Sequence, residues 1–187
     1  MALTLTAAPT IEPVSLDEMK AHLHYPATDQ DGYISALISA ARQSCESETD
    51  RAFLTQTWTL AMEYFPSVIF VPRPPLQSVA HIVYYDENGE AQTLDEGLYQ
   101  VDTFSEPGRI APARGCSWPS VDDETMLPVR VSFVAGWDSS DDVPGEIKHA
   151  VKLLTAQWFE TLTAVTAGAM ADVPNTIKML LTHWKTF

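Results

Sequence analysis

A cluster of prolines between two strand-like segments constrains the fold of this chain more than any other feature. Pro72, Pro74 and Pro75 lie within four residues, after a strand-like segment at 68–71 and before another at 78–85. Proline fixes φ and cannot donate a hydrogen bond to a sheet ladder. Three prolines at this spacing therefore predict a rigid corner at the edge of a sheet rather than part of an active site.

The middle of the chain has the two-residue periodicity of β-strands. Strands are expected at 57–65, 68–71, 78–85, 91–94, 98–102 and 128–135. Asn88-Gly89 predicts a hairpin turn, because both residue types tolerate positive φ. Residues 105–128 are rich in proline and glycine and contain an acidic run. They are expected to form a long loop, the segment best suited to contact a partner.

Helical periodicity marks the flanking segments. Ser15 and Glu18 have the spacing of a capping box, and a second helix is expected to be capped by Asp29 or Asp31. Asp-Val-Pro precedes each of two later helices, where proline suits the first turn. Apolar stripes at helical spacing are formed by Tyr33, Ile34, Leu37, Ile38, Ala41 and Cys45, by Ile147, Val151, Leu154, Trp158 and Leu162, and by Ile177, Leu180, Leu181 and Trp184.

This order of elements predicts an α+β protein with a helical core built from both chain ends and an inserted antiparallel β subdomain. Residues 1–14 are expected to form an extended N-terminal arm and 15–55 the first helices of the core. Residues 56–140 are expected to form the β subdomain, with its long loop at 105–128. Residues 141–187 are then expected to complete the helical core.

Composition excludes some classes of function. The formal net charge of −14 argues against a nucleic-acid binder, whose affinity would come from Lys and Arg on phosphates. There is no leader-like opening and no apolar run of membrane-spanning length, so we expect a protein made and kept in the cytoplasm, or assembled there into a particle. Cys45 and Cys116 fit no metal or redox spacing; reduced thiols are expected, with a disulfide left open.

Motifs for catalysis are missing from the sequence. It has no glycine-rich phosphate loop, no Gly-x-Ser-x-Gly, no His-Glu-x-x-His and no Cys-x-x-Cys. The five histidines have no ligand spacing. Asp122, Asp123 and Glu124 could form half of a metal site, but a solvated loop is the preferred interpretation. We therefore expect no catalytic residue, metal or cofactor.

Ten segments, read in order, resemble the tailed-phage head–tail connector family, also found in prophages and gene transfer agents. They are Pro13–Leu23, Ile38–Arg42, Thr49–Trp58, Pro72–Val79, Tyr99–Asp102, Pro107–Ile110, Ser117–Pro119, Val131–Trp137, Val143-Pro144 and Ile147-Lys148. Each segment alone is a weak signal, but their order and spacing together are specific. The chain differs where the family usually has glycine, at Asp50.

The resemblance implies a structural protein of the virion neck, assembled in the host cytoplasm. Such connectors form a ring, commonly of twelve subunits, beneath the portal protein. The ring extends the DNA channel and presents a surface to the stopper or tail-completion protein. Packaged DNA would pass through the lumen without specific binding, and no membrane is involved. A closed ring requires two different complementary patches on each subunit.

Six residues are expected at interfaces, from exposure and from the enrichment of aromatic residues and arginine there: Trp118, Arg73, Arg109, Lys178, Trp184 and Lys185. Two alternatives to the connector stay open. One is a small acidic hydrolase or metal-dependent enzyme that uses the acidic loop at 122–124. The other is a dimeric adaptor of non-viral origin.

Overall fold

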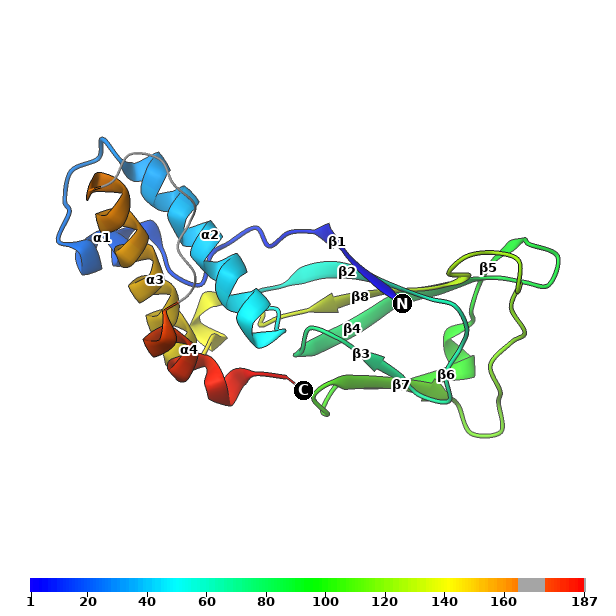
Figure 1. Ribbon diagram of the computed structural model, residues 1–187. Helices are drawn as coiled ribbons and strands as arrows, with labels where there is room; N and C mark the ends of the chain where they lie inside the picture. The colour runs from blue at the N-terminus through cyan, green and yellow to red at the C-terminus, as the bar shows by residue number, and fades with distance from the viewer. Residues whose placement is uncertain (165–173, 187) are drawn as a thin grey trace. The chain divides into compact units, whose positions relative to one another are not determined.

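The computed structural model describes residues 1–164 and 174–186 of the chain (Figure 1). They divide into two compact units. The β unit consists of Met1–Pro9 and Thr55–Gly136, and the helical unit of Thr10–Leu54 and Trp137–Phe187. This arrangement confirms the α+β class, with antiparallel sheets inserted between helical segments.

The larger sheet of the β unit has five antiparallel strands. Their order is β1 (Ala2–Ala7), β2 (Gln56–Met62), β8 (Val129–Ala135), β4 (Leu76–Tyr85) and β5 (Ala91–Thr93). The central strand β8 pairs with β2 without interruption, from Gln56 opposite Ala135 to Met62 opposite Val129. Alternate residues of β8 are buried, as its sequence period predicts. Figure 1 shows β2, β8 and β4 side by side in this order.

The smaller sheet has three antiparallel strands, in the order β3 (Ile69–Val71), β7 (Gly108–Pro112) and β6 (Tyr99–Asp102). The proline cluster carries the chain from β3 in this sheet to β4 in the larger one. Arg73 adopts a positive φ of 63° in the bend, and the peptide bond between Pro74 and Pro75 is cis. The predicted corner is confirmed, and it joins two different sheets.

The two sheets approach closely at Gly108. A Cβ atom on this glycine would lie 2.5 Å from Leu76 Cδ2 and 2.7 Å from Leu76 Cβ. Strand β7 can therefore pack this tightly against β4 only because residue 108 has no side chain. Leu76 is buried, so it has little freedom to move away.

Replacing Gly108 with alanine should lower the free energy of unfolding by about 1–3 kcal/mol, because the added methyl group overpacks the contact with Leu76. Chemical denaturation followed by tryptophan fluorescence measures this change. Gly32→Ala is the control, since a Cβ there meets nothing within 4 Å. Equal stability of the two variants would contradict the packing argument.

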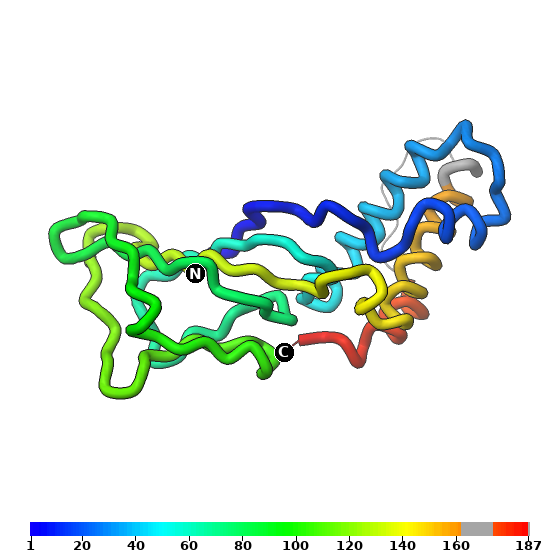
Figure 2. Tube along the Cα trace, turned by 180° about the vertical axis from the view of Figure 1, so that it is seen from behind, coloured from blue at the N-terminus to red at the C-terminus, as the bar shows by residue number. Residues whose placement is uncertain are grey.

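The helical unit contains α1 (Leu16–Leu23), α2 (Asp31–Thr49), α3 (Gly145–Ala164) and α4 (Asn175–Leu181). Helices α2 and α3 lie side by side in both views (Figures 1 and 2). Their facing apolar stripes include Ile34, Ile38, Val151 and Leu154, which belong to one buried cluster. The two long stripes thus form the centre of this unit, as their periodicity predicts.

The predicted N-cap of α1 is confirmed, whereas the predicted N-cap of α2 is not. Ser15 and Glu18 form the predicted capping box. Helix α2 has Gln30 at its N-cap, with no side-chain hydrogen bond, so the expected cap by Asp29 or Asp31 is wrong. The two carboxylates have other partners: Asp31 binds Lys20 Nζ at 2.6 Å, and Asp29 accepts a hydrogen bond from the Tyr25 hydroxyl.

Two strands lie where the sequence predicted none. Strand β1 occupies part of the expected arm at 1–14, and β7 interrupts the expected loop at 105–128. The sequence of β1 alternates, Leu3 and Leu5 with Thr4 and Thr6, but none of its residues is buried. β7 is short and ends with a proline. The side chain of Leu162 and the Asp172-Val173 pair lie outside the described residues.

Arg42 and Glu46 form a buried ion pair on α2. Arg42 Nη1 donates to Glu46 Oε2 at 2.6 Å, and Arg42 Nε donates to Glu12 Oε2 at 2.8 Å. The second oxygen of Glu46 accepts the backbone N–H of Phe53 at 2.8 Å. Both residues are buried: Arg42 is 4% exposed and Glu46 is 7% exposed. The pair links α2 to the segments that precede α1 and follow α2.

Glu46→Gln should lower the free energy of unfolding by about 3 kcal/mol, because the buried Arg42 guanidinium loses one of its two carboxylate partners and keeps only Glu12. Glu48→Gln is the matched control on the same helix. Glu48 pairs with Lys185 in a more exposed position, so its loss should cost about 1 kcal/mol or less. Urea titration of both variants makes the comparison. A difference below about 1 kcal/mol between them would contradict the assigned role of Glu46.

Candidate interaction surfaces

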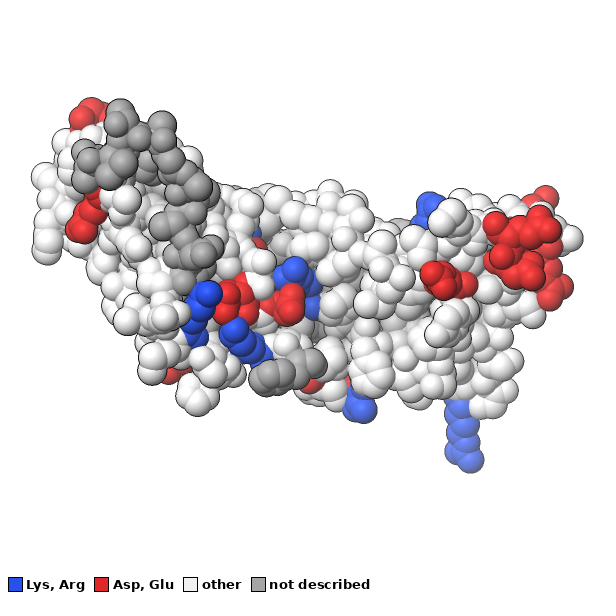
Figure 3. Space-filling model, in the orientation of Figure 1, with Lys and Arg blue, Asp and Glu red and all other residues white. Residues whose placement is uncertain are grey.

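Acidic side chains gather at the β4–β5 end of the β unit (Figure 3). The hairpin contributes Asp86, Glu87 and Glu90, and the segment at 122–124 joins it through a hydrogen bond from Asp122 N to Tyr85 O at 3.0 Å. We call these six residues the acidic cluster. Their proximity was not predicted, because 86–90 and 122–124 are far apart in the sequence.

The carboxylates of this cluster are bound by local turns. The Thr125 hydroxyl and the Glu124 N–H donate to Asp122, and they hold the pKa of that carboxyl below its usual value. The Gln92 amide, with the N–H groups of Glu90 and Asn88, likewise lowers the pKa of Asp86. A general acid at neutral pH needs a raised carboxyl pKa, which is the opposite shift.

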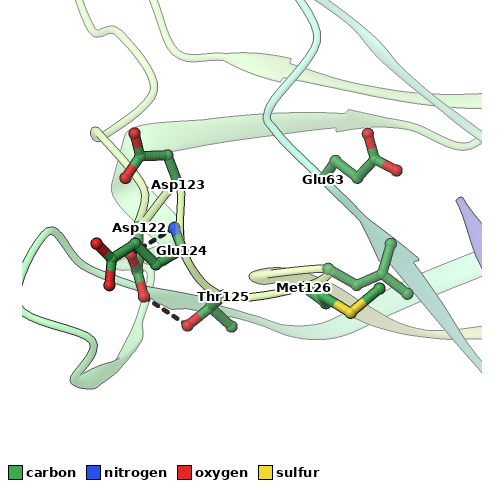
Figure 4. A pocket seen from close by; sticks show the side chains of 7 residues that line it. Glu63, Asp122, Asp123, Glu124, Thr125 and Met126 are labelled. Atoms are coloured by element: carbon green, nitrogen blue, oxygen red, sulfur yellow. Dashed lines mark hydrogen bonds between the residues drawn. The ribbon is translucent and has the colours of Figure 1, made fainter.

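A hollow of about 260 Å³ lies beside the cluster (Figure 4). It is lined by Glu63 and by the side chains of 122–127, and Glu63 lies across it from the acidic run. Among residues 1–164 and 174–186, no group of three His, Cys, Asp or Glu side chains could hold a metal ion. The hollow therefore shows no arrangement that would support the hydrolase alternative.

Trp118, expected at an interface, has partners within the β unit. Its ring stacks on Phe65 with centroids 4.8 Å apart, and its Nε1 donates to the Pro66 carbonyl at 2.7 Å. The indole is half-buried. These contacts anchor the loop at 115–120 and leave part of the ring on the surface.

Arg73 and Arg109 also lie in the β unit. The Arg73 guanidinium lies over the Trp58 ring, 5.3 Å from its centroid. Arg109 pairs with Asp102 at 2.7 Å on the exposed face of the three-stranded sheet. Asp102 further accepts hydrogen bonds from Ser105 Oγ and from the N–H groups of Phe104 and Ser105. The Ser105 and Arg109 bonds hold the pKa of Asp102 well below its usual range.

The other three expected contact residues lie in the helical unit. Trp184 Nε1 donates to Glu146 at 2.8 Å, and the Trp184 carbonyl accepts a hydrogen bond from Arg51. Lys185 pairs with Glu48 at the end of α2. Lys178 lies half-buried on α4. The six residues therefore fall into two groups on different units, and their role at an interface remains a prediction.

Sequence reasoning missed several exposed apolar side chains. They are Met1, Leu5, Tyr64, Phe70, Phe104, Met126 and Met179. Phe104 is 97% exposed on the turn that Asp102 holds. Alternation can show that a strand has two faces, but it cannot show that an apolar residue lies on the open face or at a sheet edge. These positions could be found only from the structure.

The two cysteines are free thiols in different environments: Cys45 is buried in α2 and Cys116 is exposed. Burial raises the pKa of Cys45 to about 12. The structure joins neither thiol in a disulfide, and the reduced state of both stays a prediction.

The native protein should react with one equivalent of an aromatic disulfide reagent at pH 8, through Cys116, and with two equivalents in denaturant. Cys45 is protected by burial and by its high pKa, because only the thiolate attacks. Absorbance of the released thiolate counts the reactive groups. Cys116→Ser should abolish the native reaction; a rapid second equivalent in the folded protein would contradict the burial of Cys45.

Comparison with known proteins identifies a family that part of the chain matches. Residues 13–104 match the family model described as phage gp6-like head-tail connector protein. Over these residues the chain resembles the phage head–tail connector family. Connectors of this family are structural proteins and not enzymes, which agrees with the expectation from the sequence. No curated protein sequence matches the chain.

Three solved structures share the fold. A chain from the neck of an empty gene transfer agent (GTA) particle, computed with C6 symmetry, matches with a TM-score of 0.80 and 21% identity. A chain from the virion of a native GTA particle gives 0.79 and 21%, and one from a native GTA neck computed with C12 symmetry gives 0.78 and 23%. Each match covers 100% of this chain and 96% of the other.

Proposed function

We propose that this connector forms a ring of twelve subunits beneath the portal protein in the neck of a virion. The ring extends the DNA channel and offers an attachment surface to the stopper or tail-completion protein, and it assembles in the host cytoplasm. The family match over 13–104 carries the proposal. The fold supports it, since the full length of the chain resembles chains from particle necks, one of them computed with C12 symmetry.

The charge of the chain suits a channel for DNA. With a net charge of −14, the protein repels a polyanion instead of holding it. The acidic cluster concentrates this charge at one end of the β unit (Figure 3). In the proposed ring the acidic surface faces the lumen, where like charge lets DNA slide without sticking. A lumen lined mainly by Lys and Arg in an assembled ring would rule this orientation out.

Mixing the purified protein with the portal protein of the same particle should give rings attached to portals. Negative-stain microscopy shows the particles, and native mass spectrometry counts the subunits, with each protein alone as the control. Twelve copies per portal is the expected result. A monomer or dimer that persists in the mixture would contradict the connector role and would favour the dimeric adaptor.

A further inference from the structure

Strand β1 is an unprotected sheet edge. It pairs with β2 on one side, and no strand in the described part of the chain pairs with its other side. It is six residues long, whereas the other edge strands, β3, β5 and β6, have three or four residues. Proteins usually protect an exposed edge by keeping it short or by placing charges on it. β1 has neither protection.

The pairing geometry leaves β1 ready to accept a further strand. Residues 2–5 pair with β2 in unbroken register, and the only irregularity lies between Leu5 and Ala7. None of the six residues is buried. The strand is therefore held to its sheet mainly by backbone pairing, with one side-chain hydrogen bond between Thr6 and Thr59 at 2.9 Å.

Rows of apolar side chains, one from each neighbouring strand, run across the larger sheet and end at β1, where no further strand covers them. Leu3 lies opposite Leu60, and Leu60 opposite Val131, both of which are fully buried. Leu5 continues the next row, opposite Trp58, yet it is 43% exposed. A strand added outside β1 would extend these rows and remove Leu3 and Leu5 from water, which is favourable in proportion to the apolar area covered.

The distribution of charge indicates which molecule pairs with the free edge of β1. Two copies of a chain with net charge −14 repel each other, so contact between them costs least where charged side chains are absent. Residues 1–11 contain no charged side chain. A basic partner would gain more from the acidic cluster than from this edge, which has no charged side chain.

We infer that β1 is the edge through which each copy joins a second copy of this chain, by main-chain pairing along residues 2–5 that also covers Leu3 and Leu5. This inference rests on the proposed ring. It assigns to β1 one of the two different patches that a closed ring requires of every subunit.

Leu5→Lys tests the inference, because an inward-facing charge at an edge blocks the addition of a strand. The half-exposed position lets the lysine reach water in the free chain, so the melting temperature should stay within a few degrees of wild type. Leu98→Lys is the matched control: Leu98 is 40% exposed and lies in a 3₁₀ turn at Glu96–Leu98, outside β1. Portal mixtures of both variants are compared with wild type by microscopy and native mass spectrometry.

Leu5→Lys should reduce the ring population about tenfold or more, since pairing would bury an uncompensated charge, while Leu98→Lys should assemble as wild type does. In the wild-type ring, hydrogen exchange should be slowed about tenfold or more, relative to the free chain, at those backbone amides of residues 2–5 that point away from β2. Rings from Leu5→Lys at wild-type yield, or unchanged exchange of these amides in the ring, would overturn the inference and leave the proposed function standing. Failure of the wild-type protein to assemble would overturn both.

Discussion

The buried ion pair between Arg42 and Glu46 places the strictest geometric requirement on the helical unit. A buried charge is tolerated only when an opposite charge and hydrogen bonds compensate it. Here the compensating groups come from three segments. α2 supplies the pair itself, Glu12 supplies a second carboxylate, and Phe53 supplies a backbone N–H. Apolar packing between α2 and α3 has no such directional demand. The ion pair therefore fixes where the segments on either side of the first two helices must lie, and packing then fills the space around it.

Patterns with a strictly local cause could be predicted from the sequence. The capping box at Ser15 and Glu18, the corner at Pro72–Pro75 and the alternation of β8 each depend on residues close together in the chain. The cap of α2 could not be predicted, because Lys20 on a different helix binds Asp31. β1 was missed although it carries a local signal, since Leu3 and Leu5 alternate with Thr4 and Thr6. Its pairing with β2, fifty or more residues away, could not be predicted from the sequence.

The candidate surfaces likewise depend on long-range contacts that local sequence patterns do not show. Aromatic and arginine residues were chosen because interfaces are enriched in them, yet Trp118, Arg73 and Trp184 all have partners within their own unit. The same chemistry that suits an interface, a large flat ring with one polar atom, also suits a loop anchor. Exposure separates the two uses, and it depends on long-range packing. The acidic cluster likewise exists only because a loop returns to the β4–β5 hairpin.

In the proposed ring, the high negative charge has two effects. It limits which surfaces can join the subunits, and it keeps DNA from binding in the channel. Copies that repel each other associate at the lowest electrostatic cost through surfaces without charged side chains, such as the edge of β1. Its exposure in the free chain carries a risk of uncontrolled pairing, and the charge of the rest of the molecule offsets that risk by keeping free copies apart. A template that concentrates subunits and aligns their edges would overcome the repulsion. Charge would then favour assembly at the portal over assembly in solution, while the same acidic surface lets DNA pass.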